Sequence, residues 1–166
     1  MKTKKLKYLL MGLLLVCMFG ICGCGTAAYD FNIKSSPDFR YSNLYEDYST
    51  VKSKEPFVKT SETSLGGYNI LTYKNAELDG FNVSVVYQFN EETNEFYSGI
   101  IYYYPDESEI DSVYDSLVKK CDSLYGKNHL FVDSSSHTWK ATGKYIIVYK
   151  STDKVYYAVE TPEAYE

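Results

Sequence analysis

The clearest pattern in the chain is a strict alternation of strongly apolar and other residues from 81 to 89. This period of two is typical of a strand with one buried face. The run NEETN at 90–94 predicts a hairpin loop that leads into a second strand at 95–104. A further strand is predicted at 68–74, and an edge strand is one interpretation of 56–64.

The pattern changes to steps of three and four residues after Pro105. Asp106 and Glu109 are spaced as a capping-box pair, and Gly126 is a typical helix stop. The apolar stripe between them comprises Ile110, Val113, Tyr114, Leu117, Val118, Cys121, Leu124 and Tyr125. This spacing predicts an amphipathic helix that docks on a sheet. A shorter helix is predicted at 42–51, with Ser42 as its N-cap.

Three more strand segments are expected after the long helix. They lie at 129–132, at 138–150 with a turn at 142–143, and at 154–160. The order of elements predicts an α+β, two-layer fold, in which an antiparallel β-sheet carries one long and one short helix. Two helix-plus-sheet units are a second interpretation of the same order.

The first 23 residues have the layout of a signal peptide, with four lysines followed by an apolar run over 8–21. Ile21-Cys22-Gly23-Cys24 resembles the lipobox of bacterial lipoproteins, although Cys22 is unusual at its position. This resemblance implies that 1–23 is removed and that Cys24 carries a diacylglycerol. The domain would then lie on the extracytoplasmic face of the cell membrane. The alternative is an uncleaved anchor over 8–29, which is long enough to span.

Residues 24–40 lack a sustained period, which predicts a lipid anchor with a flexible tether before a single globular domain at 41–166. The formal charge of the chain is −5. Four of its 17 basic residues and none of its 22 acidic residues lie in 1–23, so the remainder carries −9. This charge argues against a nucleic-acid partner, and it assigns membrane attachment to the lipid, because anionic headgroups repel an acidic domain.

Composition narrows the class of protein further. A chain of 166 residues that is 45% apolar has enough material for one core, which excludes disorder, collagen and a coiled coil. Of the four cysteines, only Cys121 would remain free after processing at Cys24. Cys121 lies on the helix stripe, so we expect a buried core thiol and no disulfide.

A second, weaker resemblance covers roughly 107–160. The sequence places Leu124-Tyr125-Gly126 before a polar loop, Trp139 and two apolar strands at 146–149 and 155–159. This layout resembles small uncharacterised bacterial lipoproteins with a β-lactamase-inhibitor-like arrangement of a helix on an antiparallel sheet. The proline that often follows the helix-ending glycine is replaced by Lys127. The resemblance supports the fold and carries over no functional residue.

Candidate catalytic residues are few. His129 and His137 are the only histidines, and with Asp133 they match no compact metal-binding spacing. The serines at 134–136 precede His137 without the turn that positions a nucleophile. No phosphate-binding loop, dinucleotide fingerprint or calcium loop is present. We therefore expect no enzyme, no cofactor and no metal, with a hydrolase around His137 as the weakest alternative.

Tyrosine usage is the strongest functional signal. The chain has 19 tyrosines, and one of them is Tyr8 in the signal segment. Alternation predicts that Tyr103 shares a face with Tyr97, and that Tyr102 lies on the other face. Exposed tyrosines bind flat partners at low entropic cost, although tyrosine also suits sheet margins. We expect binding through Tyr97, Tyr102 or Tyr103.

The partner of such a surface is left open by the sequence. An envelope protein is the first hypothesis, and a small molecule or glycan is the second. The oligomeric state is not predicted.

Overall fold

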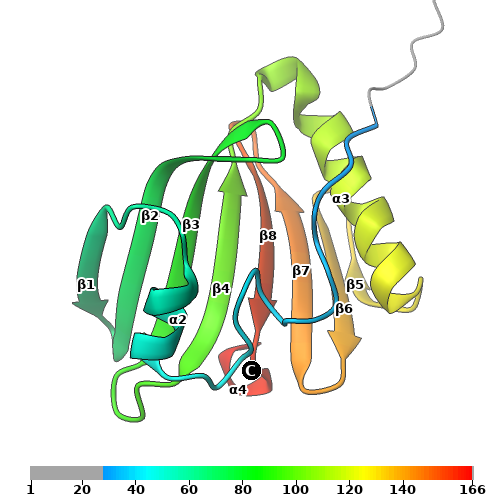
Figure 1. Ribbon diagram of the computed structural model, residues 1–166. Helices are drawn as coiled ribbons and strands as arrows, with labels where there is room; N and C mark the ends of the chain where they lie inside the picture. Colours follow the sequence, from blue (N-terminus) through cyan, green and yellow to red (C-terminus); the bar gives the residue numbers. More distant parts are fainter. Residues whose placement is uncertain (1–27, 166) are drawn as a thin grey trace, which may run out of the picture.

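The computed structural model describes residues 28–165 (Figure 1). They form a single antiparallel sheet of eight strands with a few helices, which is an α+β fold as the sequence predicted. The order across the sheet is β1-β2-β3-β4-β8-β7-β6-β5. The strands are β1 (Ser61–Leu65), β2 (Tyr68–Leu78), β3 (Phe81–Asn90), β4 (Phe96–Tyr103), β5 (His129–Val132), β6 (Ser136–Ala141), β7 (Lys144–Lys150) and β8 (Val155–Glu160).

The sheet consists of two four-stranded meanders, β1–β4 and β5–β8, which meet where β4 pairs with β8. Between the meanders the chain passes through a 3-10 turn and a long helix and resumes at β5, on the far edge (Figure 1). The last strand of each meander is therefore central, and the first strand of each, β1 or β5, lies at an edge. An edge strand was one interpretation of 56–64, and β1 lies largely within that range.

The helices of the described residues are α2 (Tyr48–Lys54), the 3-10 turn η1 (Glu107–Glu109), α3 (Ile110–Tyr125) and α4 (Pro162–Tyr165). The sequence predicted the long and the short helix and missed α4. Within residues 28–165, no helix is long and apolar enough to cross a membrane.

Helix α3 lies over the second meander and contacts β6, β7 and β8. The predicted apolar stripe is its buried face, since Val113, Leu117 and Cys121 are all inaccessible to solvent. Gly126 ends the helix at a φ of 85°, in the region that favours glycine. The predicted capping box of Asp106 and Glu109 is present, but it begins the 3-10 turn at 107–109, and α3 starts only after this turn.

The sheet has two unlike faces. The covered face carries the core, and a line of paired residues crosses it from β3 to β7: Val85, Ile101, Tyr157 and Val148. All four are buried, and the alternating residues of β3 that the sequence singled out lie on this face. We call the opposite side the open face.

The tether predicted at 24–40 is wrong for the residues that the structure describes. Residues 29–47 form a covering segment, which runs over the sheet between α3 and α2 (Figure 1). Phe31 is 0% exposed and Phe39 is 1% exposed. The ring of Phe39 packs against Tyr87 and Tyr157, with centroids 5.2 and 6.4 Å away. These apolar residues follow no helical or strand period, so the pattern that identifies tethers could not distinguish them from one.

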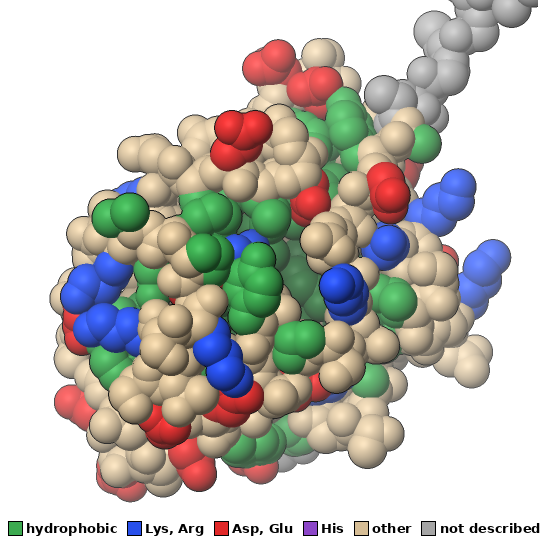
Figure 2. All heavy atoms as spheres, in the orientation of Figure 1, with side chains coloured by type: hydrophobic (Ala, Val, Ile, Leu, Met, Phe, Trp, Pro, Cys, Tyr) green, Lys and Arg blue, Asp and Glu red, His purple; other side chains and the backbone are tan. Residues whose placement is uncertain are grey.

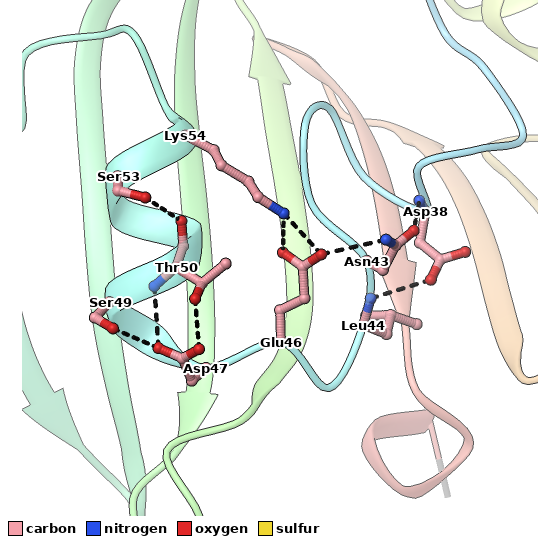
Figure 3. A network of polar contacts seen from close by, with 9 residues as sticks. All are labelled: Asp38, Asn43, Leu44, Glu46, Asp47, Ser49, Thr50, Ser53 and Lys54. Atoms are coloured by element: carbon pink, nitrogen blue, oxygen red, sulfur yellow. Dashed lines mark hydrogen bonds and ion pairs between the residues drawn. The ribbon is translucent and has the colours of Figure 1, made fainter.

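The short helix begins later than predicted. Asp47 is the N-cap of α2, and its carboxylate accepts a hydrogen bond of 3.0 Å from the backbone N–H of Thr50 (Figure 3). Ser42, the predicted cap, instead forms a backbone bridge with Phe39. Glu46 accepts from the Lys54 ammonium at 2.7 Å, which ties the covering segment to the helix. The signal peptide, the lipobox and Cys24 lie outside the described residues.

Candidate functional site

The candidate site is the open face of the sheet, where tyrosines from three adjacent strands form a row. Tyr102 of β4 pairs with Tyr156 of β8, which pairs with Tyr149 of β7. The rings of Tyr102 and Tyr156 meet edge to face at 5.8 Å, and those of Tyr156 and Tyr149 stack at 5.1 Å. We call these three residues the tyrosine row. It crosses three central strands, at a position one residue from the end of each strand.

The rings of the tyrosine row are partly exposed. Within residues 28–165 their hydroxyls make no hydrogen bond to the protein, and they are therefore available to a ligand. Burial, followed by the charges of nearby groups, raises the pKa of Tyr102 and Tyr156 above the ordinary value. These two hydroxyls thus stay neutral at physiological pH and can both donate and accept hydrogen bonds.

A second line of side chains runs beside the tyrosine row. It crosses the open face in the order Thr72, Val86, Ile100, Ala158, Ile147, Thr138 and Phe131. The middle of this line is aliphatic and its flanks carry threonines. An apolar strip bordered by aromatic rings and hydroxyls is the composition of a recognition surface rather than of a solvated one.

A third line on the open face is polar. It crosses from β2 to β7 through Ile70, Gln88, Ser98, Glu160 and Tyr145. Burial raises the pKa of Glu160, while the hydroxyl of Ser98, at 3.4 Å, lowers it. Helix α4 packs against this end of the face, because the ring of Tyr165 stacks on that of Tyr145 at 4.1 Å.

The residues predicted for binding are divided between the two faces. Tyr102 lies on the open face, in the tyrosine row. Tyr103 lies on the covered face and is 0% exposed, with its hydroxyl 3.4 Å from Asp79 Oδ2, so it belongs to the core. Tyr97 lies on the open face beside Tyr68, with ring centroids 5.4 Å apart. A bulge opposite Gln88 adds one residue to β4 there, so Tyr97 does not share a face with Tyr103 as alternation predicted.

Tyr149 and Tyr156 were not among the predicted binding residues. The pair Tyr156-Tyr157 carried the same signal as Tyr102-Tyr103, since neighbours in a strand face opposite sides. What the sequence lacks is the register that aligns Tyr102 with Tyr156. That register depends on the β4–β8 contact, between strands more than 50 residues apart in the chain.

The histidines form a separate cluster under α3. His137 Nδ1 lies 2.6 Å from the hydroxyl of Tyr114, and His129 Nε2 lies 2.7 Å from Asp122 Oδ1. Burial and then the charge of His129 lower the pKa of His137. A hydrolase built around His137 would need a carboxylate that orients this histidine. The carboxylate of Asp122 contacts His129 instead. Serine hydroxyls of the described chain make no hydrogen bond to His137.

Metal ligands are equally sparse. In the part of the chain that the structure describes, no group of three or more His, Cys, Asp or Glu side chains is placed to hold a metal ion. Cys121 is fully buried, and burial raises the pKa of its thiol far above the ordinary value. It is therefore a core residue, as its place on the stripe predicted.

Comparison of the chain with known protein families, with curated proteins and with solved structures finds no match.

Proposed function

We propose that this protein is a lipid-anchored, non-catalytic binding module on the extracytoplasmic face of a bacterial membrane. In this proposal the domain has two layers, and it docks its partner on the sheet face opposite α2, α3 and the covering segment. The observation that carries the proposal is the tyrosine row, because three partly exposed aromatic rings lie together on central strands.

The chemistry of the open face supports binding over simple solvation. Tyrosine rings supply large rigid contact area, and their free hydroxyls supply hydrogen bonds. The partly exposed Ile100 and Ile147 lie directly beside the row, on either side of the buried Ala158, and form an aliphatic strip with it. Burying such a strip under a partner is favourable, by roughly 25 cal/mol per Å² of apolar area.

A glycan of the envelope is the second candidate, and the polar line favours it. Gln88 and Glu160 are partly exposed and offer an amide and a carboxylate, with the buried Ser98 between them. Sugars present both apolar faces and hydroxyls, which match rings flanked by such groups. A protein partner would use the aliphatic strip more than the polar line.

The anchoring part of the proposal depends on the lipobox at 21–24, outside the described residues. Cys24→Ser should abolish incorporation of a fatty-acid analogue and release the protein from membranes or leave it as a precursor. Labelling that persists in the variant would contradict the lipoprotein assignment.

The docking part is tested by photo-crosslinking in cells. A photoreactive amino acid replaces Tyr149 in one full-length variant and Tyr41 in a control. Tyr41 is 52% exposed and lies in the covering segment, so it reports crosslinking at an exposed tyrosine away from the open face. We expect an adduct from position 149 and none from position 41. Mass spectrometry then separates a peptide adduct from a glycan adduct, and equal adducts at the two positions would overturn the proposal.

A further inference from the structure

A hollow opens on the covered face, between the covering segment and the sheet, with a volume of about 370 Å³. Its floor consists of Ile101, Tyr103 and Tyr157, and Leu78 adds to its apolar lining. Figure 2 shows the hollow near the middle of this side, with apolar side chains at its base. The volume lies at the lower end of the range for small-molecule sites.

The hollow contains a carboxylate without a cationic partner. Asp79 follows β2 and lines the hollow, and its side chain is partly buried. Its Oδ1 accepts from the backbone N–H of Asn32 at 3.2 Å, and its Oδ2 accepts from the hydroxyl of Tyr103 at 3.4 Å. Among residues 28–165, no Lys or Arg forms an ion pair with it. Burial raises the pKa of Asp79, against the lowering by these hydrogen bonds and by the charge of Arg40.

Two of the cations at or near the hollow are already paired. Arg40 donates to both carboxylate oxygens of Glu55, at 2.7 and 3.0 Å. Lys144 donates to Asp38 at 2.8 Å. Each pair is neutral overall. Lys34 also lines the hollow and is unpaired among residues 28–165, but it is exposed, whereas Asp79 is partly buried and is therefore the unpaired charge of the inner wall.

The geometry points to a binding site for a small aliphatic primary amine, whose ammonium pairs with Asp79 and whose carbon chain lies on Ile101 and Leu78. A partly buried carboxylate that forms no ion pair favours a cation as its partner. This site is independent of the open face and of the docking proposal.

The test uses the full-length protein and n-pentylamine, with pentanoate and 1-pentanol as ligands of similar length. Binding is followed by NMR shifts of the Ile101 and Leu78 methyl groups. Asp79→Asn is the test variant, and asparagine tolerates the positive φ of 54° at this position. Asp153→Asn is the matched control, because Asp153 is an exposed turn carboxylate whose side chain is 68% accessible.

We expect saturable methyl shifts with pentylamine and much weaker ones with the other two ligands. Asp79→Asn should weaken amine binding by roughly ten- to a hundredfold, the range for a lost charged hydrogen bond, and Asp153→Asn should leave it unchanged. The proposal is overturned if pentanoate or pentanol binds as well as the amine, if shifts occur only away from the hollow, or if Asp79→Asn binds normally. Because the wild-type shifts locate the ligand directly, the test also stands if Asp79→Asn fails to fold. Absence of any amine binding likewise overturns the proposal.

Discussion

The two faces of this sheet use the same strands and the same residue type for different purposes. Tyr103 on the covered face is 0% exposed, and its ring packs against Phe31 at 5.2 Å. Tyr102, the preceding residue, is partly exposed on the open face, where its ring contacts the ring of Tyr156. The fate of each tyrosine is thus decided by which side the helices and the covering segment occupy, and not by its own hydrophobicity.

The covered face also contains the most deeply buried charges. The side chain of Glu55 is 0% exposed and that of Arg40 is 6% exposed. Glu55 accepts a further hydrogen bond of 2.6 Å from Tyr87, and the Arg40 guanidinium lies 4.6 Å above the ring of Phe57. Burial lowers the pKa of Arg40, but the hydrogen bonds and charge of Glu55 outweigh it and raise the pKa overall. The pair therefore joins the covering segment to the residue that follows α2.

The largest expected effect comes from breaking this pair. Glu55→Ala leaves a buried guanidinium without its counter-ion, which should cost about 3–5 kcal/mol of unfolding free energy in urea titrations. Glu62→Ala is the control, since Glu62 pairs with Lys52 at the sheet edge, where its side chain is 41% exposed. Exposed pairs contribute about 0–1 kcal/mol. Similar losses in the two variants would contradict the assignment of a buried, structural pair to the covered face.

A smaller effect distinguishes two neighbours in β4. A Cβ added at Gly99 would lie 2.5 Å from Cγ and 2.7 Å from Cε1 of Phe39, so the covering segment would have to move. Gly99→Ala should therefore destabilise by about 1–3 kcal/mol, as overpacking does.

Ser98→Ala is the matched variant on the open face. It removes one long hydrogen bond to Glu160 and should cost about 1 kcal/mol or less. Thermal unfolding measures both changes. Unaltered stability of Gly99→Ala would mean that Phe39 does not pack on the sheet as described.

The smallest effect is a pH dependence of the covered side. The pKa of His137 is lowered by burial and then by the charge of His129, so the unfolded chain takes up the proton first as the pH falls. Asp122, Asp115 and Asp133 oppose this shift. Stability should therefore be complete above the ordinary histidine pKa of about 6.5 and decrease below it.

His137→Asn should flatten this part of the stability profile between about pH 5 and 7, the region where histidine titrates. Chemical unfolding at several pH values provides the measurement. An unchanged slope in the variant would show that His137 is not desolvated under α3.

The sequence was most informative where one face of an element is buried. The alternation at 81–89 and the stripe through Val113, Leu117 and Cys121 predicted β3 and α3, because periodic burial leaves a periodic pattern. The covering segment was missed because Phe31 and Phe39 are held by tertiary contacts alone. The apolar residues of this segment follow neither a helical nor a strand period.

The candidate site was predictable only in part. Opposite orientation of Tyr102 and Tyr103 follows from strand geometry, but which of them is buried depends on the path of residues 29–47. The bulge that moves Tyr97, and the register that aligns Tyr102 with Tyr156, depend on pairing between distant strands. Neither leaves a signal in a single sequence.

The most direct test of the two-faced sheet is the unfolding free energy of Tyr103→Ala compared with that of Tyr102→Ala. Loss of the buried ring should cost about 3–5 kcal/mol. Loss of the partly exposed ring removes mainly its aromatic contact with Tyr156 and should cost about 1 kcal/mol, while it weakens crosslinking to the partner from position 149. Equal losses of stability would contradict the account, because both rings would then be core residues and the open face would not exist.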